Sequence, residues 1–193
     1  DLVRKMVGVN AGVEAVLMSL PGVSGNNELS TQYAVRGGNY DENLVYVNEI
    51  EVYRPFLIRS GQQEGLSFVN SDLTSSVDFS AGGFQAKYGD KLSSVLDITY
   101  RRPTDFEAST NMSLLGGQVA IGNKSESGRF TALAGLRYRD NSLFVNAKET
   151  EPNFRPRFAD AQAYLTHKVS NKFELGFLGN ASLNDYRYEP LTR

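Results

Sequence analysis

In the second half of the chain, apolar and polar residues alternate with a period of two over long runs. From Phe130 to Tyr138 the even positions are apolar, whereas Thr131 and Arg137 are among the polar odd positions. Successive side chains of a β-strand point to opposite faces of its sheet, so this period predicts strands with one apolar and one polar face. The alternating run Phe106–Leu114 loses its phase at Leu115-Gly116-Gly117, as a β-bulge would cause. The same alternation occurs in three further runs: Phe106–Leu114, Ala161–Val169 and Phe173–Asn184.

Two kinds of fold produce this alternation: a soluble antiparallel sheet with one wet face, and the wall of a transmembrane β-barrel. The runs are longer than the usual soluble strand of about five or six residues. Alanines such as Ala132 and Ala163 are frequent on the apolar face, where a packed core would favour larger side chains. Short and long connections also alternate, Ser170–Lys172 against Asn141–Arg157, as they do in outer-membrane barrels. The pattern alone leaves both folds open.

The first half of the chain mixes helix and strand signals, which predicts a small α/β unit. Apolar residues spaced for one helical face occupy residues 13–20, with Asn10 as the expected N-cap and Pro21-Gly22 as the stop. Asn70 is expected to cap a second, short helix near Ser71–Ser76. β-branched and aromatic residues predict four strands: Tyr33–Val35, Leu44–Val47 with continuation through Val52, Val77–Phe79 and Val95–Tyr100.

The composition excludes several classes of function. The chain of 193 residues carries 20 Lys and Arg against 22 Asp and Glu, so it lacks the basic balance typical of nucleic-acid binding. It has no cysteine and a single histidine, His167, so we expect no Cys-based or His-pair metal site and no thiol chemistry. No apolar run approaches the roughly 18 residues of a membrane-spanning helix. Because Asp1-Leu2-Val3 does not open a signal peptide, we expect a fragment of a longer polypeptide.

Four ordered blocks of sequence occupy the first half of the chain. They read Leu20-Pro21-Gly22-Val23, Val35-Arg36-Gly37-Gly38, Asn43-Leu44-Val45-Tyr46-Val47 with Val52-Tyr53, and Asp78-Phe79-Ser80-Ala81-Gly82-Gly83-Phe84-Gln85-Ala86-Lys87-Tyr88-Gly89 followed by Ser93-Ser94-Val95-Leu96-Asp97-Ile98. In order and spacing they resemble the plug domain of TonB-dependent outer-membrane receptors, and most closely those of the Bacteroidetes type. The resemblance covers residues 13–103.

The resemblance implies the fold of both halves. In that family a plug fills a transmembrane barrel of 22 strands. We therefore expect an α+β plug domain over residues 1–103, followed over residues 104–193 by antiparallel strands, about the first four of the barrel. The chain departs from the family at three places: Ala81 replaces a basic residue, Ser94-Val95 replaces a glycine pair, and Asn48-Glu49 replaces Asp-Gly, so that this last turn is expected to differ.

The resemblance also implies a function, uptake of a scarce ligand across the cell outer membrane. TonB, driven by the proton-motive force, would pull a segment upstream of this fragment and remodel the plug, without catalysis or a cofactor. The ligand stays open between a siderophore, cobalamin, a glycan and a peptide. The expected partners are TonB, the rest of the barrel, the ligand and outer-membrane lipid, and no nucleic acid.

Arg36 is the first residue that the resemblance singles out, as a buried latch holding the plug against the barrel wall. The plug loops that face outside are expected to contact the ligand. They offer amide, acid, guanidinium and aromatic groups, from Asn26, Asn27, Glu28, Tyr53, Arg54 and Phe56. Asp41-Glu42 is an adjacent carboxylate pair in a turn, whose side chains we expect to point apart and to remain solvated.

Two other functions compete with transport. A soluble surface-binding or adhesin module would bury the apolar face of residues 104–193 in a closed core. An enzyme such as a glycoside hydrolase would need two carboxylates about 5–10 Å apart in a cleft, and the spacing of carboxylates in this sequence does not support such a pair. We therefore expect the protein not to be an enzyme.

Overall fold

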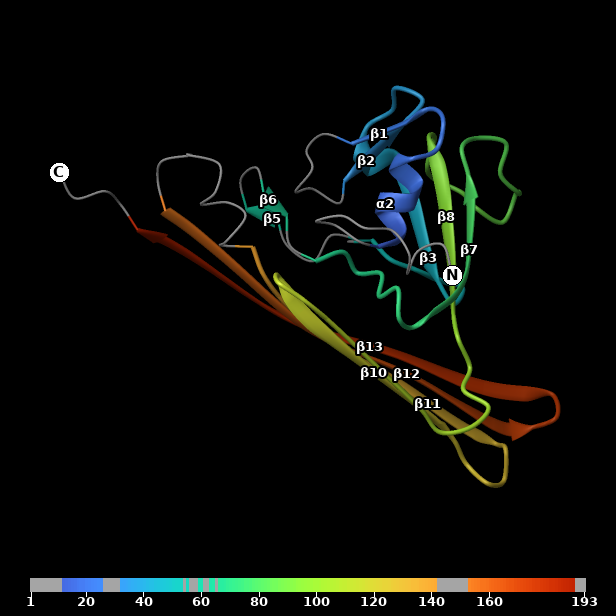
Figure 1. Ribbon diagram of the computed structural model, residues 1–193. Coiled ribbons are helices and arrows are strands. Elements are labelled where there is room, and N and C mark those ends of the chain that lie inside the picture. The colour runs from blue at the N-terminus through green and yellow to red at the C-terminus, as the bar shows by residue number, and fades with distance from the viewer. Residues whose placement is uncertain are drawn as a thin grey trace. The chain divides into compact units, whose positions relative to one another are not determined.

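The chain forms two units, residues 1–101 and residues 102–193. The computed structural model describes residues 12–25, 32–53, 55, 59–60, 63–64, 66–141 and 153–189 (Figure 1). None of the helices in these ranges is long and apolar enough to cross a membrane. The first unit contains these elements: α2 (Val13–Met18), β1 (Val23–Gly25), β2 (Tyr33–Val35), η1 (Tyr40–Glu42), β3 (Asn43–Val47), β4 (Ile50–Glu51), β5 (Arg59–Ser60), β6 (Gln63–Glu64), β7 (Thr74–Ser80) and β8 (Ser94–Tyr100).

A four-stranded mixed sheet forms the centre of the first unit, in the order β4-β3-β8-β7. Strands β3 and β8 are parallel, and the other two pairs are antiparallel. β-branched and leucine side chains suit these strands because they fill the space above a pleated surface. The largest share of the core comes from one set of fully buried residues: Val47, Leu73, Val95, Leu96, Ile98 and Tyr100. The predicted strands at Tyr33–Val35 and Val95–Tyr100 are confirmed, the latter with one more residue.

The predicted first helix is present but shorter than expected. Val13 and Leu17 are buried, as the helical spacing requires, but the helix ends at Met18 and Leu20 is 38% exposed beyond it. Pro21-Gly22 forms the expected turn, with Gly22 at φ 80°. The expected N-cap, Asn10, lies outside the described residues.

Two expectations for the middle of this unit are wrong, and both involve asparagine. The strand at β3 does not continue through Val52, because Asn48 and Glu49 adopt φ values of 50° and 67° and turn the chain back, so that Val47 pairs with Ile50. Asn70 does not start a helix. Its Oδ1 accepts a hydrogen bond from Asp72 N at 3.0 Å, which closes a local turn that leads directly into β7.

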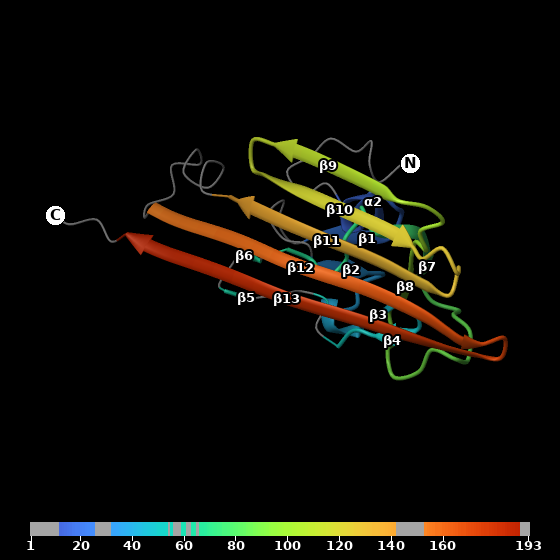
Figure 2. The ribbon, with the colours of Figure 1, turned by 90° about the horizontal axis from the view of Figure 1, so that it is seen from below.

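The second unit is one antiparallel sheet in the order β13-β12-β11-β10-β9, so each strand pairs with its neighbours in sequence (Figure 2). The strands are β9 (Glu107–Ser113), β10 (Gly116–Lys124), β11 (Phe130–Asp140), β12 (Asn153–Ser170) and β13 (Phe173–Glu189). There are five described strands where the alternation predicted about four.

The additional strand explains the loss of phase near Gly116, which is not a bulge. Leu114 and Leu115 form a two-residue turn between β9 and β10, with Ser113 paired to Gly116. Gly116 is at φ 148°, and a Cβ there would lie 2.0 Å from the backbone oxygen of Tyr138. Only glycine fits this turn. The sheet does have an irregularity, but it lies between Lys168 and Ser170.

The two faces of this sheet differ in chemistry, as the alternation predicts. On β11, the odd positions include the fully buried Leu133, and the even positions include Leu136, which is 61% exposed. On β13 the exposed apolar residues continue with Phe177 and Leu183. The soluble alternative required this apolar face to be buried in a closed core, and in the described residues of β9–β13 it is exposed. That finding contradicts the soluble alternative.

Candidate functional site

Arg36 follows β2 at a turn whose geometry requires the two glycines after it. Arg36 and Gly37 have φ values of 50° and 82°, and Arg36 N donates a hydrogen bond to Gly22 O at 2.8 Å. A Cβ on Gly38 would lie 1.8 Å from Ser93 Oγ and 2.7 Å from Glu42 Oε2. Gly38 therefore allows the segment around Ser93 to approach the turn closely, which explains the Arg-Gly-Gly sequence in physical terms.

Three glycine-containing turns meet around the side chain of Arg36. A Cβ on Gly22 would lie 3.6 Å from Arg36 Cγ, and a Cβ on Gly82 would lie 3.5 Å from Arg36 Nη1. Gly22 and Gly82 both have positive φ values, 80° and 90°, which a residue with a side chain rarely adopts. These glycines leave space beside the arginine from both sides. The first and second glycine blocks of the sequence are thus parts of one structure.

The guanidinium of Arg36 is exposed in this structure, and among the residues described no carboxylate forms an ion pair with it. The arrangement therefore presents a cation whose backbone is fixed by a strained turn and by the hydrogen bond to Gly22. The predicted role of Arg36 as a latch stays a prediction, because its partner was expected on the barrel wall.

The segment Lys91–Ser94 is joined to η1 and to the start of β3 by three hydrogen bonds. Ser93 Oγ donates to Glu42 Oε2, Ser94 Oγ donates to Asn43 Oδ1, and Lys91 Nζ donates to Asp41 O, each at 2.7 Å. Ser94, the first residue of the Ser94-Val95 pair that replaces two glycines, thus joins β8 to β3 through its side chain. Glu42 accepts one of these bonds, so the Asp41-Glu42 pair has a structural use.

Tyr88 fixes the end of the second glycine block on the outer face of the mixed sheet. Its hydroxyl donates a hydrogen bond to Asp97 Oδ2, and Lys87 Nζ lies 3.7 Å from the same oxygen. The rings of Tyr88 and Tyr46 are 5.4 Å apart. Burial and the hydrogen bond to Asp97 raise the pKa of Tyr88. The hydroxyl is therefore a stable donor at neutral pH, and the loop is held by a neutral tyrosine and one carboxylate.

The expected ligand-contacting loops are described only in part. Tyr53 follows β4 and is 84% exposed, which suits a contact residue. The structure brings no second predicted contact residue beside it, since the others lie outside the described residues: Asn26, Asn27, Glu28, Arg54 and Phe56. Their role in binding stays a prediction.

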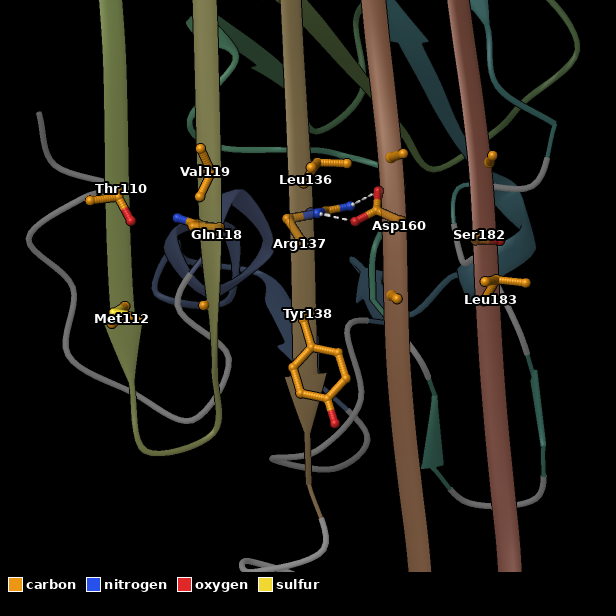
Figure 3. A pocket seen from close by; sticks show the side chains of 14 residues that line it. Thr110, Met112, Gln118, Val119, Leu136, Arg137, Tyr138, Asp160, Ser182 and Leu183 are labelled. Carbon is orange, nitrogen blue, oxygen red and sulfur yellow. Dashed lines mark hydrogen bonds and ion pairs between the residues drawn. The ribbon is translucent and has the colours of Figure 1, made fainter.

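The exposed face of the five-stranded sheet contains a shallow apolar hollow of about 720 Å³ (Figure 3). The register aligns its lining residues in two rows that cross the sheet. Each row contains small residues beside large ones, and the small residues leave the hollow. One row contains Thr110, Val119, Leu136, Ala161 and Ala181, and the other contains Met112, Gly117, Tyr138, Ala159 and Leu183.

The opposite face of the same sheet carries a buried ion pair that the sequence analysis missed. Arg137 Nε and Nη2 donate to the two oxygens of Asp160 at 2.6 and 2.8 Å (Figure 3). The two side chains are only 9% and 1% exposed. Asn180 Nδ2 donates to Asp160 Oδ2 at 3.5 Å, and Gln162 is also buried. The signal that could have found the pair is the register, since Arg137 lies directly opposite Asp160.

The charged residues on the apolar face lie at its end. Beyond Tyr138, Arg157 Nε donates to Asp140 Oδ2 at 3.0 Å, and these side chains are 43% and 26% exposed. The nine positions from Phe130 to Tyr138 thus form an apolar band with an aromatic residue at each end and an ion pair beyond one end. A transmembrane β-strand needs roughly 9–11 residues, and aromatic residues mark both of its interfaces.

Comparisons with known proteins agree with this geometry. Residues 1–95 match the family model of the TonB-dependent receptor plug domain. The solved structure of the siderophore receptor PirA from Pseudomonas aeruginosa is similar with a TM-score of 0.66 and 19% identity, over 96% of this chain and 32% of that chain. A mutant of the ferric enterobactin receptor PfeA from the same organism, in complex with enterobactin, is similar with a TM-score of 0.59 and 16% identity, over 90% of this chain and 31% of that one.

The chain thus spans about a third of the length of the solved structures that it resembles. At these identities the similarity establishes the fold. No curated protein sequence is significantly similar to this chain. The expected order, a plug followed by antiparallel strands, is confirmed.

Proposed function

Because residues 1–95 belong to the TonB-dependent receptor plug domain family, we propose that this chain is the plug and the first wall strands of an active transporter. The transporter takes a scarce ligand across the outer membrane into the periplasm. TonB-dependent receptors are outer-membrane proteins, and the outer membrane is the location of this protein.

The single observation that carries the proposal is the sheet that follows the plug, with its apolar face exposed and its polar face buried. Leu136 and Leu183 are 61% and 78% exposed, whereas Asp160 and Gln162 on the other face are 5% and 3% exposed. In water this arrangement would be unfavourable, because apolar surface is driven out of contact with water. Next to lipid it is favourable, and a polar face then lines the inside of a barrel.

The backbone supports the same proposal. A lipid-facing strand must pair all of its N–H and C=O groups, because hydrocarbon offers no hydrogen bonds. Strands β10, β11 and β12 are paired on both sides, and β9 and β13 are the edges of the described sheet. The rest of the barrel wall would pair with β9 and β13 and close the sheet.

The proposed mechanism uses binding and mechanical work. The ligand binds at the outer side of the plug. TonB, driven by the proton-motive force, then pulls the chain from a segment upstream of the plug. The pull remodels the plug and opens a path for the ligand. No bond of the ligand is made or broken, so the protein is a transporter and not an enzyme.

Arg36 is the proposed latch in this mechanism. Its guanidinium is placed by the turn at Gly37 and by the space at Gly22 and Gly82, and it has no ionic partner among the residues described. An acidic residue of the remaining wall would supply that partner. Tyr53 is the proposed contact residue for the ligand on the described part of the plug.

The similar structures suggest which class of ligand to test first. The two similar structures are a siderophore receptor and a ferric enterobactin receptor. We propose a ferric siderophore as the first class of ligand to test, with cobalamin, glycans and peptides in the same panel.

The test is growth of a strain that lacks the full-length gene. The strain is grown on iron-limited medium with one purified ferric siderophore at a time. We expect it to lose growth on at least one siderophore and to regain that growth when the gene is restored. A strain without TonB should show the same loss. Growth of the deletion strain equal to the parent on the whole panel, cobalamin, glycans and peptides included, would contradict the proposed function.

A further inference from the structure

The N-terminal part of the plug is peripheral to its central sheet (Figure 1). The four-stranded sheet contains neither α2 nor β1, and β1 pairs only with β2 among the described strands. That pairing has three residue pairs, from Val23 with Val35 to Gly25 with Tyr33. Among the described residues of the plug, residues 12–25 are therefore the part that a pull on the N-terminus reaches first, and little strand pairing holds them.

Helix α2 carries a buried carboxylate in addition to its apolar contacts. Val13 and Leu17 are 2% exposed each, and Glu14 on the same helix is only 7% exposed. A buried carboxylate is costly unless hydrogen bonds stabilise it. Ser67 Oγ donates such a bond to Glu14 Oε1, and the two residues are 53 positions apart in the sequence. The Glu14–Ser67 bond thus connects α2 to a distant part of the plug.

The serine end of this bond is fixed. Ser67 Oγ also accepts a hydrogen bond from Val69 N at 3.1 Å, so the direction of its own hydrogen toward Glu14 is set. Three residues later, Asn70 N lies within hydrogen-bonding distance of the hydroxyl oxygen of Tyr100, at 3.4 Å. Tyr100 is the last residue of β8 and is 1% exposed. The segment at Ser67 is therefore part of the core that surrounds the central sheet.

The charge of Glu14 also acts on the next strand. Burial raises the pKa of Tyr33 at the start of β2, and the Glu14 carboxylate adds to that rise. Helix α2 also contacts β2. It therefore packs against two segments of the plug, β2 and the segment at Ser67.

We propose that the Glu14–Ser67 hydrogen bond is the joint that holds α2 on the plug until the chain is pulled from its N-terminus. The inference rests on the proposed function, which supplies the pull. Glu14 and Ser67 are positioning residues. Once the joint breaks, α2 leaves and β1 separates from β2 one pair at a time, starting at Val23. The central sheet stays paired during this step.

The test applies force to the full-length receptor in a lipid bilayer. A tether holds the N-terminus at constant force, and the lifetime before the first extension is measured. Hydrogen bonds to a charged group are stronger than neutral ones. We expect Ser67→Ala and Glu14→Ala each to shorten this lifetime about tenfold, which converts to about 1.4 kcal/mol. The double variant should shorten it by less than the two single changes combined, because both changes break the same shared bond.

The chain offers a matched control in Ser93→Ala. Ser93 Oγ donates a bond of the same kind to Glu42 Oε2 at 2.7 Å, across 51 positions, and α2 takes no part in it. We expect this variant to leave the first lifetime unchanged, even where it lowers the melting temperature as much as Ser67→Ala does. Glu14→Gln retains an acceptor oxygen and should retain most of the lifetime, so it replaces Glu14→Ala if that variant does not insert.

Two results would overturn the joint. One is a first lifetime of Ser67→Ala equal to that of the wild type, and the other is an equal shortening by Ser93→Ala. Neither depends on TonB, because the tether supplies the force. Failure of the proposed function would instead appear as unchanged growth of the deletion strain, with the tether result unaffected.

Discussion

The plug buries its large apolar residues, whereas the sheet that follows it exposes many of its own. In the plug, Val47 and Leu96 lie inside and are 0% and 1% exposed. In the sheet, Leu136 and Phe177 point outward and are 61% and 60% exposed, while the Arg137–Asp160 pair is buried. The same residue types thus serve two environments. The plug is suited to contact with water, and the exposed apolar face of the sheet suits the proposed contact with lipid.

The different packing of the two regions follows from this difference. The plug needs large side chains that fill its core, and its polar side chains form local clasps such as Ser93 with Glu42. The outer face of the sheet needs no interlocking with a second layer of protein, so alanine and glycine can alternate with leucine and tyrosine there. The hollow between Tyr138 and Leu183 is a consequence. Substitutions that act differently in the two regions test this comparison.

The largest effect is expected from removing the buried acid of the sheet. Asp160→Ala removes one side of a buried ion pair, a loss that typically costs about 3–5 kcal/mol. Unfolding of the full-length protein in bilayers with a chemical denaturant measures this loss. Asp140→Ala is the control, because its pair with Arg157 is half exposed. There the loss should be about 1 kcal/mol or less. Equal losses for the two variants would contradict the distinction between the faces.

A core substitution in the plug comes next. Leu96→Ala removes a buried side chain from β8 and leaves a cavity, with an expected loss of about 2–5 kcal/mol. Thermal unfolding of the full-length variant should show a lower transition temperature. The exposed Leu92, 84% exposed in the loop before β8, is the matched leucine, and Leu92→Ala should change the transition little. A reversed order of the two leucines would refute the assigned core.

Charge on the exposed face of the sheet distinguishes lipid from water. Leu136→Arg should cost about 2–4 kcal/mol if the residue lies near the middle of the bilayer. In water the same change at a residue that is 61% exposed would be nearly neutral. Folding yield into lipid vesicles of the full-length variant, compared with Leu136→Met, gives the measurement. A yield equal to that of the methionine variant would mean that this face does not contact lipid.

The smallest effect on the folding of the plug itself is expected for Arg36→Ala, because the side chain is exposed in this chain. Leakage of a small polar solute through the receptor in vesicles should rise, since the plug loses its proposed latch. Arg36→Lys retains the charge and should leak less than Arg36→Ala. Leakage of the alanine variant equal to that of the wild type would remove Arg36 from this role.

Much of the fold was predictable because local chemistry dominates it. The alternation at Phe130–Tyr138 specified both the strand and its two faces, and the glycine blocks indicated the plug. The prediction was wrong where a turn depended on a particular side chain. Asn48 tolerates a positive φ and its Oδ1 accepts a hydrogen bond from Tyr100 N at 2.8 Å, a partner 52 positions away. No local pattern contains that information.

The sequence by itself determined which residues face outward in the sheet and which side chains form the plug core, because periods of two and of about 3.6 are properties of the backbone. Only the tertiary structure decided which distant residues meet. Arg137 lies opposite Asp160, Glu14 is bonded to Ser67, and Gly22 and Gly82 flank Arg36. These pairings depend on the strand register and on how the chain folds back on itself. Both result from the packing of a whole unit, so no short segment of the sequence specifies them.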